Sequence, residues 1–484
     1  GVFDAPKETH MRKTKIICTL GPSSNKRETI MAMVKAGMNV ARFNFSHGTQ
    51  ETHLATYNEL NWVRNELGAA VGALLDTKGP EIRTGILKGG KALLREGSEF
   101  DLVTDDIEGD ERQVSITYKQ LPQDLGGNKR IMLDDGLIEL EVLEILDNRI
   151  RTRVLAGGEL NNRKGINIPG TRLSMPYLSE VDKDDLRFGI RTGFDIVAAS
   201  FVRRREDVQL MRDFLDENGG GHIRIMAKIE NAEGVANLKE IIQVCDSVMI
   251  ARGDMGVEIP FEEIPIIQKN IIKVASMAGK QVVTATQMLE SMVHHPRPTR
   301  AEITDVANAI YDGTSVIMLS GETANGKYPV EAVKTMARIT ERTENDINYK
   351  KRFFIDNMYQ DAHDITDAIS HATCLIAYNL HAKAIITVTK SGTTAYMISR
   401  FRSDIPIIAC TPDASVWRQM SLSWGVTGLM VGEERVMEVL FDRAINTAKH
   451  SGLVEAGDLV VLTTGIPLSQ SGSTNLIKVT HVPG

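Results

Sequence analysis

Charged and hydroxyl-bearing side chains follow directly after short apolar runs in this 484-residue chain. The second run ends in Arg42, Asn44 and Ser46, which alternation along a strand places on one face. The third run ends in Asp76 and Thr77. An arginine binds a phosphate or carboxylate through two parallel hydrogen bonds, and carboxylate, hydroxyl and amide oxygens suit a hard cation. Taken alone, each segment is also compatible with a capped loop.

The fifth and sixth runs end in carboxylates. Lys228 and Glu230 lie two residues apart, so strand alternation places them on the same face. Asp254 follows the sixth run and is preceded by Gly253. Because Mg²⁺ typically takes one or two carboxylates and completes its shell with substrate oxygens and water, Glu230 and Asp254 are predicted to bind it. A purely structural Lys228–Glu230 ion pair is the alternative.

The last two runs add hydroxyls and one more carboxylate, Thr286 after the seventh and Ser320 and Glu322 after the eighth. These groups suit a proton relay. No histidine follows His47 in these segments, and no Ser–His–Asp pattern occurs, so acyl transfer fits poorly. Cations, hard-metal ligands and hydroxyls fit phosphoryl transfer, in which catalysis is charge neutralisation and positioning.

Eight apolar runs carry these residues, and their length and two-sided apolarity predict strands buried in a parallel sheet. Amphipathic stretches of helical period follow most of them. Repeated βα units predict an α/β protein with a (β/α)8 barrel, with an open doubly wound sheet as the alternative. The runs are Lys15–Leu20, Asn39–Phe45, Ala70–Asp76, Asp195–Val202, Arg224–Ile229, Ser247–Arg252, Gln281–Thr286 and Ser315–Ser320. The predicted helices are Glu28–Lys35, Glu51–Glu66, Arg205–Asn218, Val235–Cys245, Phe261–Ala278, Thr299–Ala309 and Pro329–Asn348.

One gap breaks this period. The stretch from Asp76 to Asp195 is far longer than a loop and a helix require. Within it, Ile131–Val154 alternates apolar and charged residues around a turn at Asp147-Asn148, which predicts a β-hairpin. We therefore predict that residues 82–174 form an inserted all-β, barrel-like domain. Such an insertion lies over the C-terminal face of the barrel, where it can act as a moving lid.

The remaining chain predicts further divisions. Residues 1–10 are interpreted as an N-terminal extension, 11–81 and 175–349 as the catalytic barrel, and 350–484 as a smaller α/β domain. That domain contains a helix candidate, Ile365–Leu380, and strand candidates Ala384–Thr389, Pro406–Thr411, Leu459–Thr464 and Leu476–His481. Its first strand leads into Thr389, Lys390, Ser391, Gly392, Thr393 and Thr394. This loop suits a phosphate at a helix start, or is a plain turn capped by Ser and Thr.

Composition excludes several classes. The 56 basic and 63 acidic residues give a net charge of −7, so neither a nucleic acid nor an anionic membrane is expected as the main partner. Four cysteines without a CxxC pair predict neither a disulfide framework nor a structural zinc site. No apolar stretch is long enough to cross a membrane, and the first ten residues do not resemble a signal peptide. We expect a cytoplasmic protein.

Several long motifs, in order, resemble the pyruvate kinase family. They are residues 39–48 (NVARFNFSHG), 75–83 (LDTKGPEIR), 227–231 (AKIEN), 251–258 (ARGDMGVE), 284–289 (TATQML), 297–302 (RPTRAE) and 318–323 (MLSGET). The resemblance covers residue 11 to the C-terminus, and we expect the bacterial type without the extra C-terminal domain that some bacterial relatives carry. It implies the last step of glycolysis: phosphoenolpyruvate and ADP give pyruvate and ATP through an enolate that is then protonated.

The resemblance also implies residue roles. Arg42 contacts the substrate phosphate, and Lys228 stabilises the transferring phosphoryl group. The Gly253–Asp254 backbone and Thr286 hold the substrate carboxylate. Thr286, Ser320 and Glu322 are the candidates for protonating the enolate through water. The nucleotide residues are Asn44, His47, Arg83 and Lys164.

Two kinds of cation are implied as cofactors, Mg²⁺ (or Mn²⁺) and K⁺. Glu230 and Asp254 bind the divalent ion. Asn44, Ser46, Asp76 and Thr77 bind the monovalent ion, and Glu81 matches the K⁺-dependent members.

The C-terminal domain resembles the family's regulatory domain. Residues 389–394 there bind a phosphorylated effector, and Ser469–Asn475 resembles the loop that closes over it. The family is usually a homotetramer. Two rival functions remain at this point: a Mg²⁺-dependent lyase acting on pyruvate-like enolates, and a binding protein that has lost activity.

Overall fold

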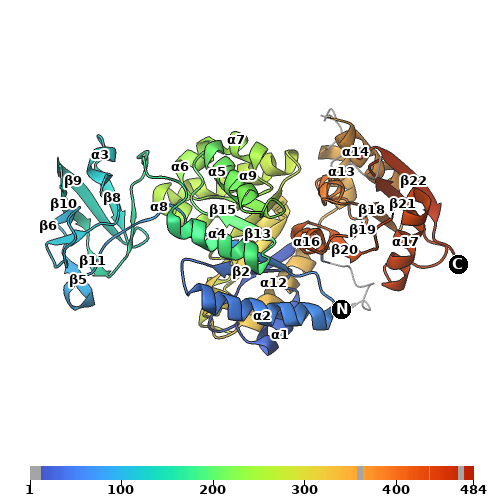
Figure 1. The fold of residues 1–484 in the computed structure, drawn as a ribbon, viewed down its shortest axis with the longest axis horizontal. Helices are drawn as coiled ribbons and strands as arrows, with labels where there is room; N and C mark the ends of the chain where they lie inside the picture. The colour runs from blue at the N-terminus through green and yellow to red at the C-terminus, as the bar shows by residue number, and fades with distance from the viewer. Residues whose placement is uncertain (1–11, 357–363, 435, 467–473) are drawn as a thin grey trace.

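A computed structural model describes residues 12–356, 364–434, 436–466 and 474–484. The predicted extension at 1–10 and most of Ser469–Asn475 lie outside these residues. Figure 1 shows three bodies in a row, with the barrel between the inserted strands and the C-terminal sheet. Within the described residues, no helix combines the length and apolarity that a membrane crossing requires.

The central body is a closed parallel barrel in the order β1-β17-β16-β15-β14-β13-β3-β2. Pairing of β1 with β17 closes it, which excludes the open sheet and confirms the predicted (β/α)8 class. All eight strands lie inside the predicted apolar runs. They are β1 Lys15–Thr19, β2 Val40–Asn44, β3 Gly72–Asp76, β13 Ile196–Ala199, β14 Arg224–Ile229, β15 Ser247–Ala251, β16 Gln281–Ala285 and β17 Val316–Leu319.

Helices cover the outside of the barrel. They are α1 Arg27–Ala36, α2 Gln50–Leu67, α4 Glu180–Thr192, α5 Arg205–Glu217, α6 Ala232–Ala236, α7 Leu238–Val244, α9 Ile264–Met277, α10 Arg300–Asp312 and α12 Pro329–Glu344. Short helices η2 Phe261–Glu263 and η3 Glu290–Val293 lie in connections. Sequence analysis did not predict α4, although Ser179 begins it with a capping box to Asp182. It also did not predict α8 Arg252–Glu258 or α11 Gly321–Ala324, which begin directly after strands β15 and β17.

The chain between β3 and α4 forms a seven-stranded sheet in the order β4-β12-β8-β9-β10-β6-β7 and a two-stranded sheet β11-β5. The predicted hairpin is present as β9 and β10, which pair antiparallel. A separate apolar core that includes Phe100, Leu102 and Ile131 fills this region. The elements are β4 Ile82–Arg83, η1 Lys88–Gly90, β5 Lys91–Leu94, β6 Glu99–Val103, β7 Gln113–Ser115, α3 Leu121–Asp124, β8 Arg130–Leu133, β9 Ile138–Leu146, β10 Arg149–Ala156, β11 Gly158–Asn161 and β12 Gly165–Asn167.

The C-terminal body is a five-stranded sheet in the order β20-β19-β18-β21-β22, with only β22 antiparallel. The four predicted strands are present, and β20 was not predicted. The elements are α13 Tyr349–Asp356, α14 Ile365–Asn379, β18 Ala384–Val388, α15 Thr393–Ser399, β19 Ile407–Thr411, α16 Ala414–Gln419, η4 Met420–Leu422, β20 Val426–Met430, α17 Met437–His450, β21 Leu459–Thr464 and β22 Leu476–His481.

A buried carboxylate joins this body to the amino-terminal end of the barrel. Asp195, at the start of β13, is fully buried. Its oxygens accept from Arg64 of α2 at 3.0 Å and from Arg418 of α16 at 2.8 Å. The backbone N–H of Ala73 also donates to it at 2.9 Å. We call this group the floor triad: Asp195, Arg64 and Arg418.

Candidate active site

A cavity of about 780 Å³ lies at the carboxyl ends of the barrel strands, where the inserted sheet meets the barrel. Side chains from both bodies line it. The carboxyl ends of the parallel strands all lie at one end of the barrel, so residues remote in sequence come together there. The residues predicted from sequence that line it are Arg42, Asn44, Ser46, His47, Glu81, Arg83, Lys164, Lys228, Glu230 and Asp254.

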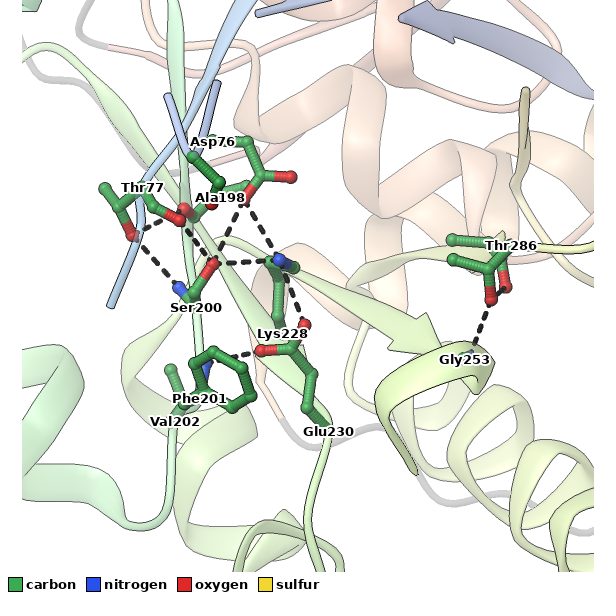
Figure 2. Close-up of polar contacts among 12 residues, drawn as sticks. Asp76, Thr77, Ala198, Ser200, Phe201, Val202, Lys228, Glu230, Gly253 and Thr286 are labelled. Carbon is green, nitrogen blue, oxygen red and sulfur yellow. Dashed lines mark hydrogen bonds and ion pairs between the residues drawn. The ribbon is translucent and has the colours of Figure 1, made fainter. Parts of the chain in front are cut away.

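Lys228, near the end of β14, is at the centre of a buried polar network (Figure 2). Its Nζ lies 3.0 Å from Asp76 Oδ1, 2.8 Å from Ser200 Oγ and 3.0 Å from Glu230 Oε1. Burial alone would lower the pKa of Lys228, but the charges of Asp76 and Glu230 outweigh it and raise that pKa. Lys228 is therefore a fixed cation facing the cavity.

Asp76 holds a second cation beside the first. Arg42 Nε donates to Asp76 Oδ2 at 2.6 Å, and Arg42 also donates to Thr19 Oγ1 at 2.9 Å. Burial would raise the pKa of Asp76, yet Lys228 and Arg42 lower it on balance. One buried carboxylate thus fixes two cations at the cavity wall. We call this group the mouth triad: Asp76, Arg42 and Lys228.

The predicted divalent-metal residues line the same cavity. Glu230 Oε1 meets Lys228, and Oε2 accepts from the backbone N–H of Phe201 at 2.5 Å. Phe201 has φ 55°, a conformation uncommon for a bulky residue. Asp254 lies in the first turn of α8.

The donor set fits Mg²⁺. Burial raises the pKa of Glu230, and the nearby charges of Asp254 and Asp76 raise it further, against the effect of Lys228 and the Phe201 N–H. A bound cation would relieve this repulsion. Among the described residues, no group of three or more His, Cys, Asp or Glu side chains is arranged to hold a metal. Two carboxylates alone are the donor set of an ion that completes its shell with substrate oxygens and water.

The four residues predicted for K⁺ divide into two pairs. Asn44 and Ser46 line the cavity, and Asn44 Oδ1 accepts from the Ser46 N–H at 3.1 Å. Asp76 and Thr77 are buried behind the wall. The carbonyl of Thr77 accepts from Ser200 Oγ at 2.6 Å. The set supplies amide, hydroxyl, carboxylate and carbonyl oxygens, which are the ligands of a hard cation.

Gly253 and Thr286 form a second cluster, away from the Lys228 network in Figure 2. The Gly253 N–H donates to Thr286 Oγ1 at 2.8 Å. Thr286 and Gln287 have φ of 71° and 55°, so two successive residues adopt the strained left-handed conformation. Arg252 donates to the Thr286 carbonyl at 2.7 Å and pairs with Asp305 at 2.8 Å, which holds this turn in place.

Ser320 and Glu322 lie after β17 and do not line the cavity. Glu322 is fully buried, and its carboxylate accepts from the backbone N–H groups of Leu289 and Ser320 at 3.0 and 2.7 Å. Burial raises the pKa of Glu322 despite these bonds. Ser320 Oγ is buried without a hydrogen-bond partner among the described residues. Glu322 thus links the segments that follow β16 and β17 through these two hydrogen bonds.

The predicted nucleotide residues line the same cavity. Arg83 Nε donates to Glu81 at 2.8 Å, and Lys164 Nζ pairs with Asp134 at 2.8 Å. Both cations are partly exposed. His47 is exposed on the opposite, barrel side.

Sequence analysis missed two residues of the central network, Ser200 and Thr19. Ser200 follows β13 and contacts Lys228, Asp76 and Thr77. Thr19 ends β1 and contacts Arg42. Both residues lie near the ends of apolar runs, the first and the fourth, so the strand-end rule used for the other six runs points to them as well. The cavity-lining Asp134 and Asp135, in a turn of the inserted sheet, carried no comparable signal.

The loop at 389–394 is a compact turn in the C-terminal body. Thr389 Oγ1 accepts from the Gly392 N–H at 2.9 Å, and Gly392 has φ +82°. Ser391 and Thr393 hydroxyls lie 2.9 Å apart, and Thr394 Oγ1 lies 2.8 Å from Thr474 Oγ1. Lys390 is exposed. The Thr389 hydroxyl closes the turn before α15, whose N-cap residue, Gly392, has no side chain to cap the helix.

Comparison with known proteins gives a consistent result. The family model described as pyruvate kinase, barrel domain, matches residues 11–333, and that described as pyruvate kinase, alpha/beta domain, matches 367–480. Pyruvate kinase of Geobacillus stearothermophilus is 48% identical over 473 residues, covering 97% of this chain and 80% of the relative. That of Clostridium acetobutylicum is 47% identical, covering 97% and 99%. A crystal structure of a Cryptosporidium parvum pyruvate kinase aligns with a TM-score of 0.92 at 40% identity, covering 98% of this chain and 96% of that one.

Proposed function

The chain belongs to the pyruvate kinase family, whose members are phosphotransferases, and from that premise we propose that it converts phosphoenolpyruvate and ADP into pyruvate and ATP. The observation that carries the proposal is the mouth triad. It holds the cationic ends of Arg42 and Lys228 at the wall of a cavity that also contains the carboxylates Glu230 and Asp254. Arg83 and Lys164, which line the same cavity from the inserted sheet, favour a kinase over a lyase, because a lyase needs no nucleotide-phosphate contacts.

Charge neutralisation is the proposed contribution of the mouth triad. Arg42 binds the substrate phosphate, and Lys228 donates to the phosphoryl oxygens as they pass from the enol oxygen to the terminal phosphate of ADP. Because both cations are already fixed by Asp76, little reorganisation is needed when charge develops. Glu230 and Asp254 would hold Mg²⁺ or Mn²⁺, and Asn44, Ser46, Asp76 and Thr77 would hold K⁺. Each ion would add positive charge beside the transferring phosphoryl group.

The Gly253–Thr286 cluster is the proposed site of the substrate carboxylate. The Gly253–Asp254 backbone and Thr286 orient the substrate so that its phosphate points towards Lys228. After phosphoryl loss, the enolate carbon accepts a proton, and we propose that Thr286, Ser320 and Glu322 deliver it through water. His47, Arg83, Lys164 and Asn44 bind the nucleotide.

A coupled assay of ATP formation from phosphoenolpyruvate and ADP tests the proposal directly. We expect turnover that requires Mg²⁺ or Mn²⁺ and rises with K⁺, and loss of turnover when EDTA removes the divalent ion. Absence of ATP under every cation condition would overturn the proposed reaction.

We also propose that a phosphorylated metabolite binds the loop at 389–394 and activates the enzyme. Support comes from the hydroxyls of that loop and the exposed charge of Lys390. Lys390→Glu should abolish activation by sugar phosphates while turnover in their absence persists. Unchanged activation would place the effector elsewhere.

The remaining expectations are proposals of the same kind. We propose that residues 82–174 act as a lid over the barrel formed by 11–81 and 175–349, and that 350–484 form the regulatory domain. We further propose a cytoplasmic homotetramer.

A further inference from the structure

The turn that follows β2 carries three side chains with proposed ligand roles, Asn44, Ser46 and His47. The turn is tight. The Ser46 N–H donates to Asn44 Oδ1 at 3.1 Å, and the His47 N–H donates to the Asn44 carbonyl at 3.2 Å. Gly48 then adopts φ +77° before α2 begins. The orientation of all three side chains depends on how this exposed turn is held.

His53, in the first turns of α2, lies against this turn. Its ring stacks on Phe45 with centroids 4.3 Å apart and planes 20° apart. Phe45 is itself buried, so the stack fixes the plane of the imidazole. In that plane, His53 Nε2 lies 2.9 Å from the carbonyl oxygen of His47.

The direction of this hydrogen bond follows from the partner. A carbonyl oxygen only accepts, so Nε2 carries the proton. Burial lowers the pKa of His53, and Lys78 lowers it further, whereas the His47 carbonyl and Asp185 of α4 raise it. On balance the pKa of His53 is lowered, which favours the neutral ring, and the hydrogen bond to the His47 carbonyl places a proton at Nε2.

Gly48 shows how closely the turn packs on the ring. A Cβ added at Gly48 would lie 3.3 Å from His53 Nε2 and 3.0 Å from Thr52 Oγ1. The capping box between Thr49 and Thr52 fixes the start of the helix that carries His53. The helix is thus anchored by its cap, and the turn before it is anchored by the imidazole.

We propose that His53 is a positioning residue for the cation and nucleotide sites. Its Nε2–H holds the His47 carbonyl and so fixes Asn44 and Ser46 at the cavity wall and His47 at its rim. This inference rests on the proposed function, since it takes the ligand roles of Asn44, Ser46 and His47 from there. Arg42, Lys228 and Thr286 are held by other contacts, so the phosphoenolpyruvate site is independent of His53.

Two variants of His53 separate the contribution of its aromatic ring from that of its N–H donor. His53→Phe keeps an aromatic ring over Phe45 and removes the donor, whereas His53→Gln keeps an N–H donor and removes the ring. We expect His53→Phe to raise the half-saturating K⁺ concentration and the KM for ADP about tenfold, the effect of one lost hydrogen bond. The KM for phosphoenolpyruvate should change less than about twofold. His53→Gln should restore most of the loss.

His450→Phe is the matched control. His450 Nδ1 contacts the Asn446 carbonyl at 2.6 Å on α17, so this variant loses an imidazole–carbonyl contact remote from the cavity. We expect wild-type constants for K⁺ and ADP. Calorimetric titration with ADP, in Mg²⁺ and K⁺, should show the same order of affinity as the kinetics: wild type and His450→Phe tightest, and His53→Phe weakest.

Each outcome is decisive. Wild-type K⁺ and ADP constants in His53→Phe would overturn the positioning role while leaving the proposed function intact. An equal rise in the KM values of phosphoenolpyruvate and ADP, or a lower melting temperature with unchanged KM values, would assign His53 to folding alone and also overturn it. Failure of the wild-type protein to form ATP would instead overturn the proposed function, and the ligand roles with it.

Discussion

The two ends of the barrel contain the same arrangement with opposite consequences. At each end a buried aspartate is paired with two cations, Asp76 in the mouth triad and Asp195 in the floor triad. The pKa of Asp76 is lowered, because Lys228 and Arg42 outweigh its burial. The pKa of Asp195 is raised, because burial outweighs Arg64 and Arg418.

The difference lies in what surrounds the cations. Arg42 and Lys228 line an open cavity, so a ligand can share their charge. Arg64 comes from α2 of the barrel and Arg418 from α16 of the C-terminal body. Their shared pairing with Asp195 joins these two bodies, so their charge stabilises the fold. A buried ion pair is weak evidence for stability by itself. Access to a cavity is what separates the mouth triad, with its proposed catalytic role, from the floor triad.

Replacement of Lys228 should have the largest effect. Lys228→Met should lower kcat by about a thousandfold, equivalent to about 4 kcal/mol of activation free energy, with phosphoenolpyruvate binding largely kept. Stopped-flow or coupled assays measure kcat, and ligand titration measures binding.

Lys15→Met is the control for Lys228→Met at the floor. Lys15 is also buried, donates to the Val426 carbonyl at 2.8 Å, and has a pKa lowered by burial to about 8. We expect it to lower the melting temperature and leave kcat within about threefold of wild type, since the charge lies far from the mouth. Near-normal turnover in Lys228→Met would reject the role of the mouth triad.

The second-largest effect is expected when the aspartate of the floor triad is replaced. Asp195→Asn leaves the buried Arg64 and the partly exposed Arg418 without their shared charged partner and should lower the free energy of unfolding by about 3 kcal/mol. Urea unfolding followed by circular dichroism measures it, and kcat should stay close to wild type. Asp76→Asn, the same change at the mouth, should reduce kcat instead. Equal loss of activity in both variants would remove the distinction between the two ends.

The pH dependence of the free energy of unfolding should also distinguish the mouth of the barrel from its floor. Burial raises the pKa of Glu258, which lines the cavity, from 4.5 to about 7. Its contribution to stability is present below pH 4.5 and is lost as the pH rises through about 7. Glu258→Gln should therefore gain stability relative to wild type between pH 5 and 7, reaching about 1–2 kcal/mol after solvent screening. Urea unfolding midpoints of wild type and Glu258→Gln across that pH range measure the difference. Midpoints that change with pH in the same way in both proteins would contradict the prediction.

The smallest effect is expected outside both ends. Lys334 pairs with Glu331 at 2.8 Å on the surface of α12, with both side chains about half exposed. Lys334→Ala should change the free energy of unfolding by less than about 0.5 kcal/mol. Thermal melts at low and high salt check this. A loss as large as that of Asp195→Asn would show that burial is not what separates these ion pairs.

Most of the barrel was predictable because its strands are apolar on both faces, which leaves a local pattern in each run. Helix α4 and strand β20 were missed for different reasons. Helix α4 begins with a recognisable capping box but follows the long insertion, outside the repeating βα pattern. Strand β20 is at the edge of its sheet, partly exposed and interrupted by Gly428, so it lacks the pattern of a buried strand.

The sequence by itself determined which side chains stand at the strand ends, because strand positions follow from local hydrophobic pattern. The tertiary structure alone decided how those side chains pair. Asp76 ends β3 and Lys228 lies near the end of β14, and the strand order β14-β13-β3, with only β13 between them, brings their atoms within 3.0 Å. The same strand order places Thr19 against Arg42 and Ser200 against Lys228, and Asp195 is buried at the other end. Contacts between side chains of different strands depend on long-range packing, which local sequence patterns do not indicate.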